Sequence, residues 1–244
     1  MHRHLVVLFF ALLLIPSLAE GQQRPERNIS QRVVLSRGAN GVDGSLEIVS
    51  DARFSSATRE KMWGNGDWAF VLSETDPLYK SFSATPPLDA ELRIEDATGH
   101  VLAEEVLERP LARIEKTRLS GEKQTLFVTV DYSVGVGSYA GLTTMLLRVQ
   151  NGGMEWVSAT NPDTGKRVPI HLPKTLKTGW ELSDAGRREI LAVSCRPDSD
   201  REDNSTIRYI TYRWDEHKGW LMYERAEKGM WESDEPFPSR TKFP

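Results

Sequence analysis

The strongest constraint on the fold is a pattern in which apolar and polar side chains alternate over short runs that end in turn residues. We count about a dozen such runs between residues 33 and 224. A period of two is typical of strands that bury one face, and Gly, Asn, Asp and Pro residues interrupt such strands. We therefore predict an all-β chain of antiparallel meanders with at most one or two short helices. Meanders of this kind assemble as a sandwich or as a propeller-like array.

Two tight turns are predicted to close hairpins. The sequence Asp96-Ala97-Thr98-Gly99 separates the runs at residues 92–94 and 101–102, and Asn151-Gly152-Gly153 separates 145–149 from 154–157. Asn, Asp and Gly tolerate the positive φ angles that such turns require. The other predicted strands lie at residues 33–35, 46–49, 68–72, 126–130, 176–182, 189–195, 207–214 and 220–224.

Helix signals gather in a single segment, residues 51–63. Ser55 or Ser56 can cap the N-terminus of a helix there, and Glu60 can act as its capping-box partner. The sequence thus predicts one short helix between two strands.

A weak internal repeat relates residues 124–160 to residues 189–225. In each stretch a strand, a loop, a second strand, a tight turn and a third strand follow one another and end near Trp156 or Trp220. Leu126 and Leu191 lie 65 positions apart, and the two Trp residues lie 64 positions apart. This spacing indicates two related units of about 65 residues. Chance similarity between two amphipathic meanders is the alternative.

The N-terminal residues have the layout of a secretory signal peptide. Arg3 precedes an apolar run at residues 5–15, and Ser17 and Ala19 are small residues at the −3 and −1 positions of a cleavage site. The run is shorter than the roughly 20 residues that span a bilayer, although an uncleaved anchor is the alternative. We predict cleavage after Ala19 and a periplasmic or extracellular location. The expected segments are a signal peptide at 1–19, a flexible leader at 20–30 and a single β-rich domain at 31–244 without a transmembrane segment.

The charge of the chain limits which partners it is expected to bind, and its cysteine content limits what can stabilise its fold. The net charge is −4, and Lys and Arg are scattered among Asp and Glu, so nucleic acid is not an expected partner. The single Cys195 excludes an intramolecular disulfide. Its apolar surroundings at residues 190–195 predict a buried thiol rather than a nucleophile.

The candidate binding site is a glycine-rich loop at residues 131–141. Glycine lets the backbone approach a ligand closely, and unpaired N–H groups in such a loop can hold an anion. A strand follows this loop where nucleotide-binding loops require a helix, so nucleotide binding is not predicted. A plain connection between two strands is the alternative. The predicted ligand-binding residues are Asp131, Tyr132, Gly135, Gly137, Ser138, Tyr139 and Gly141.

Large aromatic residues are concentrated in the C-terminal third of the chain. Alternation along residues 207–214 places Tyr209 on one face of a strand and Tyr212 and Trp214 on the other. These rings either pack inside a sheet that is covered on both faces or form a platform that stacks on sugars or grips a partner. The predicted aromatic surface comprises Tyr209, Tyr212, Trp214 and Trp220.

The residues after Lys228 are predicted to lie over a sheet. They include three prolines, which prevent the segment from continuing as a strand. Trp231 and Phe237 are the expected anchors, since large apolar rings are seldom left in water.

No metal or cofactor site is predicted. The three His residues after the signal peptide lack zinc-ligand spacing. The acidic stretch at 198–204 lacks the glycine of a calcium loop, and both it and residues 40–44 are interpreted as solvated turns. A Ser-His-Asp triad or a pair of catalytic carboxylates would be assembled only by folding, so neither leaves a local pattern.

These features favour an exported, non-enzymatic β-rich module of the cell envelope or the secreted fraction. Its expected partner is an envelope or extracellular protein or a glycan, and a purely structural role is a further possibility. The alternative is an exported hydrolase, glycosidase-like or esterase-like, that uses carboxylate or Ser-based catalysis. Converging carboxylates or a Ser–His pair in a deep pocket would favour the hydrolase.

Overall fold

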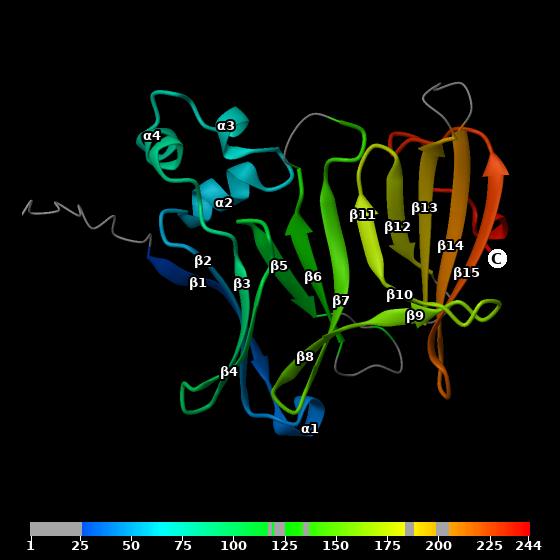
Figure 1. Ribbon diagram of the computed structural model, residues 1–244, viewed down its shortest axis with the longest axis horizontal. Coiled ribbons are helices and arrows are strands. Elements are labelled where there is room, and N and C mark those ends of the chain that lie inside the picture. The colour runs from blue at the N-terminus through cyan, green and yellow to red at the C-terminus, as the bar shows by residue number, and fades with distance from the viewer. Residues whose placement is uncertain (1–25, 117–118, 120–124, 134–136, 184–187, 199–204) are drawn as a thin grey trace, which may run out of the picture.

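A computed structural model describes residues 26–116, 119, 125–133, 137–183, 188–198 and 205–244 of the chain. Within these ranges the chain forms fifteen strands in three sheets. The N-terminal strands lie at one end of the long axis and the C-terminal strands at the other, with the second sheet between them (Figure 1). The predicted all-β class is confirmed.

The first sheet has the strand order β1-β2-β3-β4 and is antiparallel throughout. Its apolar face, which includes Leu46 and Leu92, shares one core cluster with Val128 and Leu147 of the second sheet. Two sheets that share a core in this way pack as the layers of a sandwich do. The strands are β1 (Arg27–Leu35), β2 (Gly44–Asp51), β3 (Glu91–Asp96) and β4 (Val101–Val106).

Strand β1 corrects the predicted boundary of the flexible leader, because residues 27–30 belong to the strand. Arg27 pairs with Asp51 and Asn28 with Ser50 of β2, and the Arg27 guanidinium lies 2.9 Å from the Glu91 carboxylate. Most side chains at this end of β1 are exposed, since β1 is an edge strand. The sequence pattern does not distinguish a polar strand at an exposed sheet edge from a polar, flexible leader.

The second sheet has the order β11-β7-β6-β5, and β8 also pairs with β7. Its central strand β6 is buried along its whole length. Val128 belongs to the core shared with the first sheet, and Phe127 belongs to the core shared with the third. Burial on both faces explains the continuous apolar run in this strand. The strands are β5 (Ala112–Lys116), β6 (Thr125–Asp131), β7 (Leu142–Gln150), β8 (Gly153–Trp156) and β11 (His171–Lys174).

The third sheet has the order β10-β9-β15-β14-β13-β12. Its described pairs are antiparallel except for β9 and β15, which run parallel. One face packs on the second sheet through Ile190, Tyr212 and Phe127. The strands are β9 (Ser158–Thr160), β10 (Arg167–Pro169), β12 (Thr178–Leu182), β13 (Glu189–Pro197), β14 (Ser205–Asp215) and β15 (Gly219–Lys228).

The C-terminal segment covers the outer face of the third sheet, which confirms the predicted docking. Trp231 and Phe243 are buried in one cluster with Tyr209 and Cys195, and Phe237 packs against that cluster. The rings of Phe237 and Phe243 stack with 5.6 Å between their centroids. Cys195 is 1% exposed, so the predicted buried thiol is confirmed as well. The segment ends in a short 3-10 helix, η1 (Arg240–Lys242).

Helices are short and occur mainly between β2 and β3. The predicted helix is confirmed as α2, where the Ser55 hydroxyl accepts a hydrogen bond from the Thr58 N–H. Among the described residues, no helix is long and apolar enough to cross a bilayer. The α-helices are α1 (Arg37–Asn40), α2 (Ser56–Met62), α3 (Trp68–Val71) and α4 (Pro77–Ala84).

Residues 68–72 form a helical turn where a strand was predicted. Asp67 caps α3 by accepting from the Ala69 N–H, and Asp76 caps α4 with Pro77 at its first position. Trp68 then packs edge-on against Phe82, with 5.6 Å between the ring centroids. A five-residue apolar run does not distinguish a strand from a short helix. The described chain therefore has more short helices than the one or two expected.

Both predicted hairpins are confirmed. Gly99 (φ 85°) lies in the β3–β4 turn, and Asn151 (φ 52°) and Gly152 (φ 77°) form the β7–β8 turn. The two stretches of the predicted repeat each contain three consecutive antiparallel strands, β6–β8 and β13–β15. Their origin from one duplicated unit stays a prediction.

Candidate functional site

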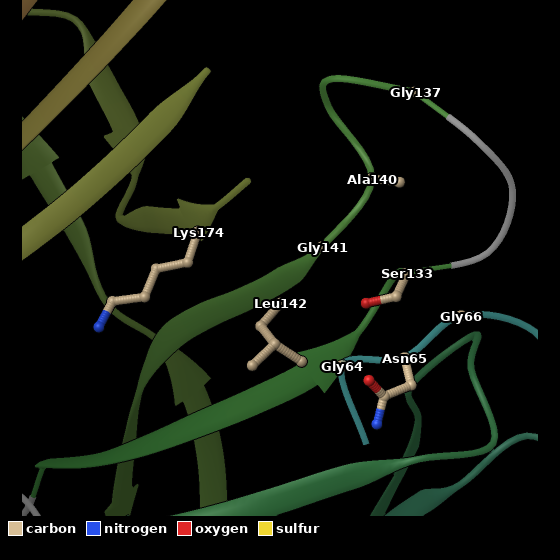
Figure 2. A pocket seen from close by; sticks show the side chains of 9 residues that line it. All are labelled: Gly64, Asn65, Gly66, Ser133, Gly137, Ala140, Gly141, Leu142 and Lys174. Carbon is tan, nitrogen blue, oxygen red and sulfur yellow. The ribbon is translucent and has the colours of Figure 1, made fainter. Parts of the chain in front are cut away.

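The described part of the glycine-rich loop forms one wall of an open pocket of about 540 Å³, which we call the loop pocket (Figure 2). The connection between α2 and α3 forms the opposite wall, and β11 contributes its last residue. Four of the lining residues are glycines, so backbone groups make up much of the surface. The lining consists of Gly64, Asn65, Gly66, Ser133, Gly137, Ala140, Gly141, Leu142 and Lys174.

A buried carboxylate at the end of β6 holds the two walls together. Asp131 is 5% exposed, and its Oδ2 accepts a hydrogen bond from the Gly64 N–H at 2.7 Å. Its Oδ1 accepts from the Ser133 N–H at 2.9 Å. Hydrogen bonds from backbone N–H groups to a carboxylate are among the stronger ones in proteins. Because both oxygens are engaged, Asp131 positions the pocket rather than offering a free base.

Close backbone contact explains the glycine at the base of the loop. The Tyr132 N–H donates to the Gly141 carbonyl at 3.0 Å, which closes the loop across its ends. A Cβ atom on Gly141 would lie 2.2 Å from the Lys174 carbonyl oxygen. Contact that close is excluded for carbon and oxygen, so only glycine lets β7 and β11 approach here.

Lys174 separates the loop pocket from a second pocket. Figure 2 shows its side chain extending so that the ammonium lies at the end remote from Ser133 and Asn65. The Nζ atom lies 4.7 Å from the centroid of the Trp180 ring. Within the described ranges, the ammonium makes no hydrogen bond or ion pair. The stem of Lys174 therefore lines the loop pocket, while its charge belongs to the neighbouring one.

The second pocket, which we call the aromatic cleft, has a volume of about 380 Å³. It lies between the start of β12 and the C-terminal segment. Three rings contribute its apolar surface, and hydroxyl, carboxylate and ammonium groups contribute the polar part. The lining consists of Lys174, Thr175, Thr178, Gly179, Trp180, Trp231, Ser233, Glu235 and Phe237.

The turn between β11 and β12 divides the two pockets and is held from both sides. On the loop side, the Lys177 N–H donates to the Ser138 carbonyl at 3.2 Å. On the side of the C-terminal segment, the Lys177 ammonium pairs with the Glu232 carboxylate, and this hydrogen bond raises the pKa of Lys177. The Tyr139 hydroxyl donates to the Cys195 carbonyl at 3.1 Å and ties the loop to β13. The β11–β12 turn is thus a wall common to the described parts of both pockets, and these contacts hold it in place.

The structure brings only some of the predicted loop residues to the pocket. Gly137 and Gly141 line it, and Asp131 supports it from beneath. Ser138 and Tyr139 instead contact Lys177 and Cys195, as described above. Gly135 lies outside the described residues.

Tyr132 also lies away from the pocket lining. Its half-buried ring faces the Arg109 guanidinium, whose central carbon lies 5.3 Å from the ring centroid. Burial, with the negative charge of Glu108, raises the pKa of Tyr132. Its environment is that of a packing residue.

The predicted aromatic surface is not a surface. Tyr209, Tyr212 and Trp220 are 3%, 5% and 2% exposed, and Trp214 is partly buried edge-on against Trp220. The alternation itself is confirmed, since Tyr209 and Tyr212 belong to different core clusters. The second sheet covers one face of β14 and the C-terminal segment covers the other. Of the two interpretations, packing inside a covered sheet is the one that the structure supports.

Several residues of the two pockets were not found from the sequence. The run Gly64-Asn65-Gly66 has a turn-like composition that could have drawn attention, and Gly64 and Gly66 have positive φ angles. Lys174 and Trp180 carry no local signal, because they become neighbours only through the β11–β12 turn. Trp231 was predicted as an anchor but not as part of a pocket wall.

The described lining of both pockets offers hydrogen-bonding groups rather than a metal-binding set. No group of three or more His, Cys, Asp or Glu side chains in the described ranges is placed to hold a metal ion. A scan against protein-family models, a search of curated proteins and a search of solved structures each returned no match.

Proposed function

We propose that this chain is an exported, non-enzymatic binding module and that it holds a carbohydrate in the loop pocket. The observation that carries the proposal is the convergence of two glycine-containing loops on an open polar pocket of about 540 Å³. Small-molecule sites commonly measure about 300–1,000 Å³, so the pocket has a suitable size. The layout of residues 1–19 supports export.

The polar groups of the pocket suit a hydroxylated, uncharged ligand. The Asn65 Nδ2 donates to the carbonyls of Lys61 and Trp63, which leaves Oδ1 as an acceptor toward the pocket side. Ser133 adds a hydroxyl, which both donates and accepts hydrogen bonds. The carbonyl oxygens of the lining glycines each have two lone pairs, so those already bonded within the loop can accept a further hydrogen bond. Sugar hydroxyls form hydrogen bonds with all of these groups.

The same lining gives little support to the glycosidase form of the hydrolase alternative. Glycoside hydrolysis requires two carboxyl groups about 5–10 Å apart across the scissile bond. The described lining of the loop pocket has no carboxylate, and Asp131 beneath it has both oxygens engaged by backbone N–H groups. Binding without turnover is therefore the function we favour.

The proposal is tested by calorimetric titration of the chain, purified as its host produces it, with soluble oligosaccharides. Suitable probes are cello-, xylo- and chito-oligosaccharides and oligouronates. We expect saturable binding of at least one class, without release of reducing ends. Absence of binding to every class would refute the carbohydrate ligand, and time-dependent cleavage would refute the non-enzymatic role.

A variant of Gly137 tests whether the ligand binds in the loop pocket. A Cβ atom on Gly137 would meet no atom of the described residues within 4 Å, so Gly137→Val adds bulk at the pocket without a clash among them. We expect affinity to fall by about tenfold or more, which corresponds to about 1.4 kcal/mol. Gly38→Val is the matched control, because Gly38 is equally unobstructed and lies in α1 outside the pocket. Equal affinities for both variants and the parent chain would place the site elsewhere.

Export itself is tested at the N-terminus of the protein. Cleavage after Ala19 would leave Glu20 as the first residue. We expect N-terminal sequencing of the protein from the periplasm or medium to begin there. Recovery only from the cytoplasm with Arg3 retained would contradict the proposed location.

A further inference from the structure

The aromatic cleft contains the Lys174 ammonium, which forms no ion pair with a described carboxylate. Lys174 is exposed, and its ammonium lies over the Trp180 ring, 4.7 Å from the centroid, without an anionic partner in the described ranges. Its neighbour Lys177 is paired with Glu232. An aromatic face favours a cation but does not compensate its charge. Lys174 is therefore available to a negatively charged group of a ligand.

The walls of the cleft are rings held in fixed orientations. Phe237 stacks on Phe243 and meets Trp231 edge-on at 6.4 Å between centroids. A Cβ atom on Gly179 would lie 2.9 Å from the Trp231 ring, so glycine is what allows Trp231 to sit against β12. Trp180 is fixed in turn by edge-on contact with Phe127 at 5.5 Å. Rings that are already immobilised lose little entropy when a ligand covers them.

Polar groups of the cleft can bind ligand hydroxyls. Ser233 supplies a hydroxyl and Glu235 supplies a carboxylate that accepts hydrogen bonds. The hydroxyls of Thr175 and Thr178 hydrogen-bond to each other at 2.9 Å, so they add only their remaining acceptor or donor capacity. Glu235 also disfavours a densely anionic ligand, because like charges repel across a pocket this small. The cleft thus combines an apolar floor, hydroxyl-binding groups, one free cation within the described lining and one anion.

We propose that the aromatic cleft is a subsite for an acidic sugar residue, a uronate, whose carboxylate pairs with Lys174 above Trp180 while its ring packs beside Phe237. The inference rests on the proposed carbohydrate-binding function and specifies its ligand class. Lys174 lines both pockets, so a neighbouring residue of the same oligosaccharide lies in the loop pocket. One carboxylate per ring satisfies Lys174 without crowding Glu235, which distinguishes a uronate from a heavily sulfated glycan.

The probes are oligogalacturonates and oligomannuronates, each paired with its methyl ester. Esterification removes the charge and keeps the ring, so each pair isolates the role of the carboxylate. We expect the purified chain to bind at least one acid about tenfold more tightly than its ester, since hydrogen bonds to charged groups are the stronger ones. This preference should shrink as ionic strength rises.

Three lysine variants test whether Lys174 causes the preference for the acid over its methyl ester. Lys174→Met keeps the apolar stem beside the loop pocket and removes the charge, so it should bind acid and ester equally. Lys174→Arg should retain the preference. Lys166→Met is the matched control, because Lys166 is exposed in the loop between β9 and β10 and lines neither pocket. Circular dichroism melting of each variant verifies that the fold is intact.

The outcomes separate this inference from the proposed function. A preference for the acid that survives Lys174→Met would overturn the assignment of the carboxylate to Lys174. Equal binding of acid and ester by the parent chain, weakened by Gly137→Val, would retain carbohydrate binding and overturn the uronate subsite. Absence of binding to any saccharide would overturn both.

Discussion

The side chain of Gln31 forms two hydrogen bonds with the backbone of Ile114. Its Nε2 donates to the Ile114 carbonyl at 2.6 Å, and its Oε1 accepts from the Ile114 N–H at 2.7 Å. Ile114 lies on β5, the edge strand of the second sheet, so the amide of Gln31 takes the place of a neighbouring strand. This contact joins the first two sheets and covers an edge that would otherwise expose unpaired backbone groups.

Replacement of Gln31 by Leu should therefore destabilise the chain. Both backbone groups of Ile114 lose their partners, and we expect the free energy of unfolding to fall by about 1–3 kcal/mol. Urea unfolding measures the effect. Gln150→Leu is the control, because Gln150 is exposed at the end of β7, and its change should stay within about 0.5 kcal/mol. Similar losses for the two variants would show that the amide contact contributes nothing specific.

Two glycines of the predicted loop should respond differently to the same substitution. Gly141→Ala places a Cβ atom 2.2 Å from the Lys174 carbonyl, whereas the Cβ atom of Gly137→Ala would have no described atom within 4 Å. The first change should cost about 1–3 kcal/mol through overpacking, and the second should be close to neutral. Thermal melting of both variants measures the difference. A tolerant Gly141 would mean that β7 and β11 are not in the close contact described.

Removal of residues 229–244 should lower the melting temperature and expose Cys195. Trp231 and Phe243 leave the cluster that covers Cys195, so its thiol should react quickly with a maleimide. In the parent chain the thiol is 1% exposed and should be protected. Trp231→Ala tests the same contact in the full-length chain and should cost about 3–5 kcal/mol. An unchanged melting temperature and a thiol that stays protected would refute the docked segment.

The ion cluster around Glu189 predicts a loss of stability in acid. Burial favours the neutral carboxyl, but hydrogen bonds from Arg240 and Arg213 outweigh it and hold the pKa of Glu189 below its ordinary value of 4.5. The guanidinium nitrogens lie 2.8 Å and 2.9 Å from Oε1. A lowered pKa in the folded state stabilises the fold fully above the unfolded value, and this stabilisation is lost as the pH falls through the lowered pKa.

Glu189→Gln removes the titrating group and gives the measurement. At pH 7 the variant should be less stable by about 1–3 kcal/mol, because hydrogen bonds to a charged group are lost. Between pH 5 and the acid limit of folding, the difference between parent and variant should narrow. Urea midpoints at several pH values follow this change, and a constant difference would show that Glu189 does not contribute the predicted linkage.

Local patterns predicted the parts of the fold that depend on neighbouring residues. The turns at Gly99 and Asn151, the cap at Ser55 and the alternation along β14 all follow from the chemistry of a few adjacent positions. The prediction of a strand at residues 68–72 also relied on a few adjacent positions, a short apolar run, and it was wrong. The cap of this segment, Asp67, was visible in the sequence, as was the Asp76-Pro77 start of the next helix, and such caps indicate helix more strongly than the short apolar run indicates strand.

The site depended on contacts between distant segments and was only partly predictable. The glycine-rich loop was identified, but its opposite wall at Gly64 and its neighbour Lys174 lie far from it in sequence. The burial of Tyr209 required the C-terminal segment, and that of Tyr212 required the second sheet. No local pattern states which face of a strand a distant segment will cover.

The most direct test of carbohydrate binding in the loop pocket is hydrogen–deuterium exchange of the chain with and without its best oligosaccharide ligand. We predict slower exchange in residues 64–66, 137–142 and 174–180, the segments that contribute lining residues to the loop pocket and the adjoining cleft. Slower exchange confined to other surfaces, such as the outer face of the first sheet, or no change at saturating ligand would contradict the proposed site.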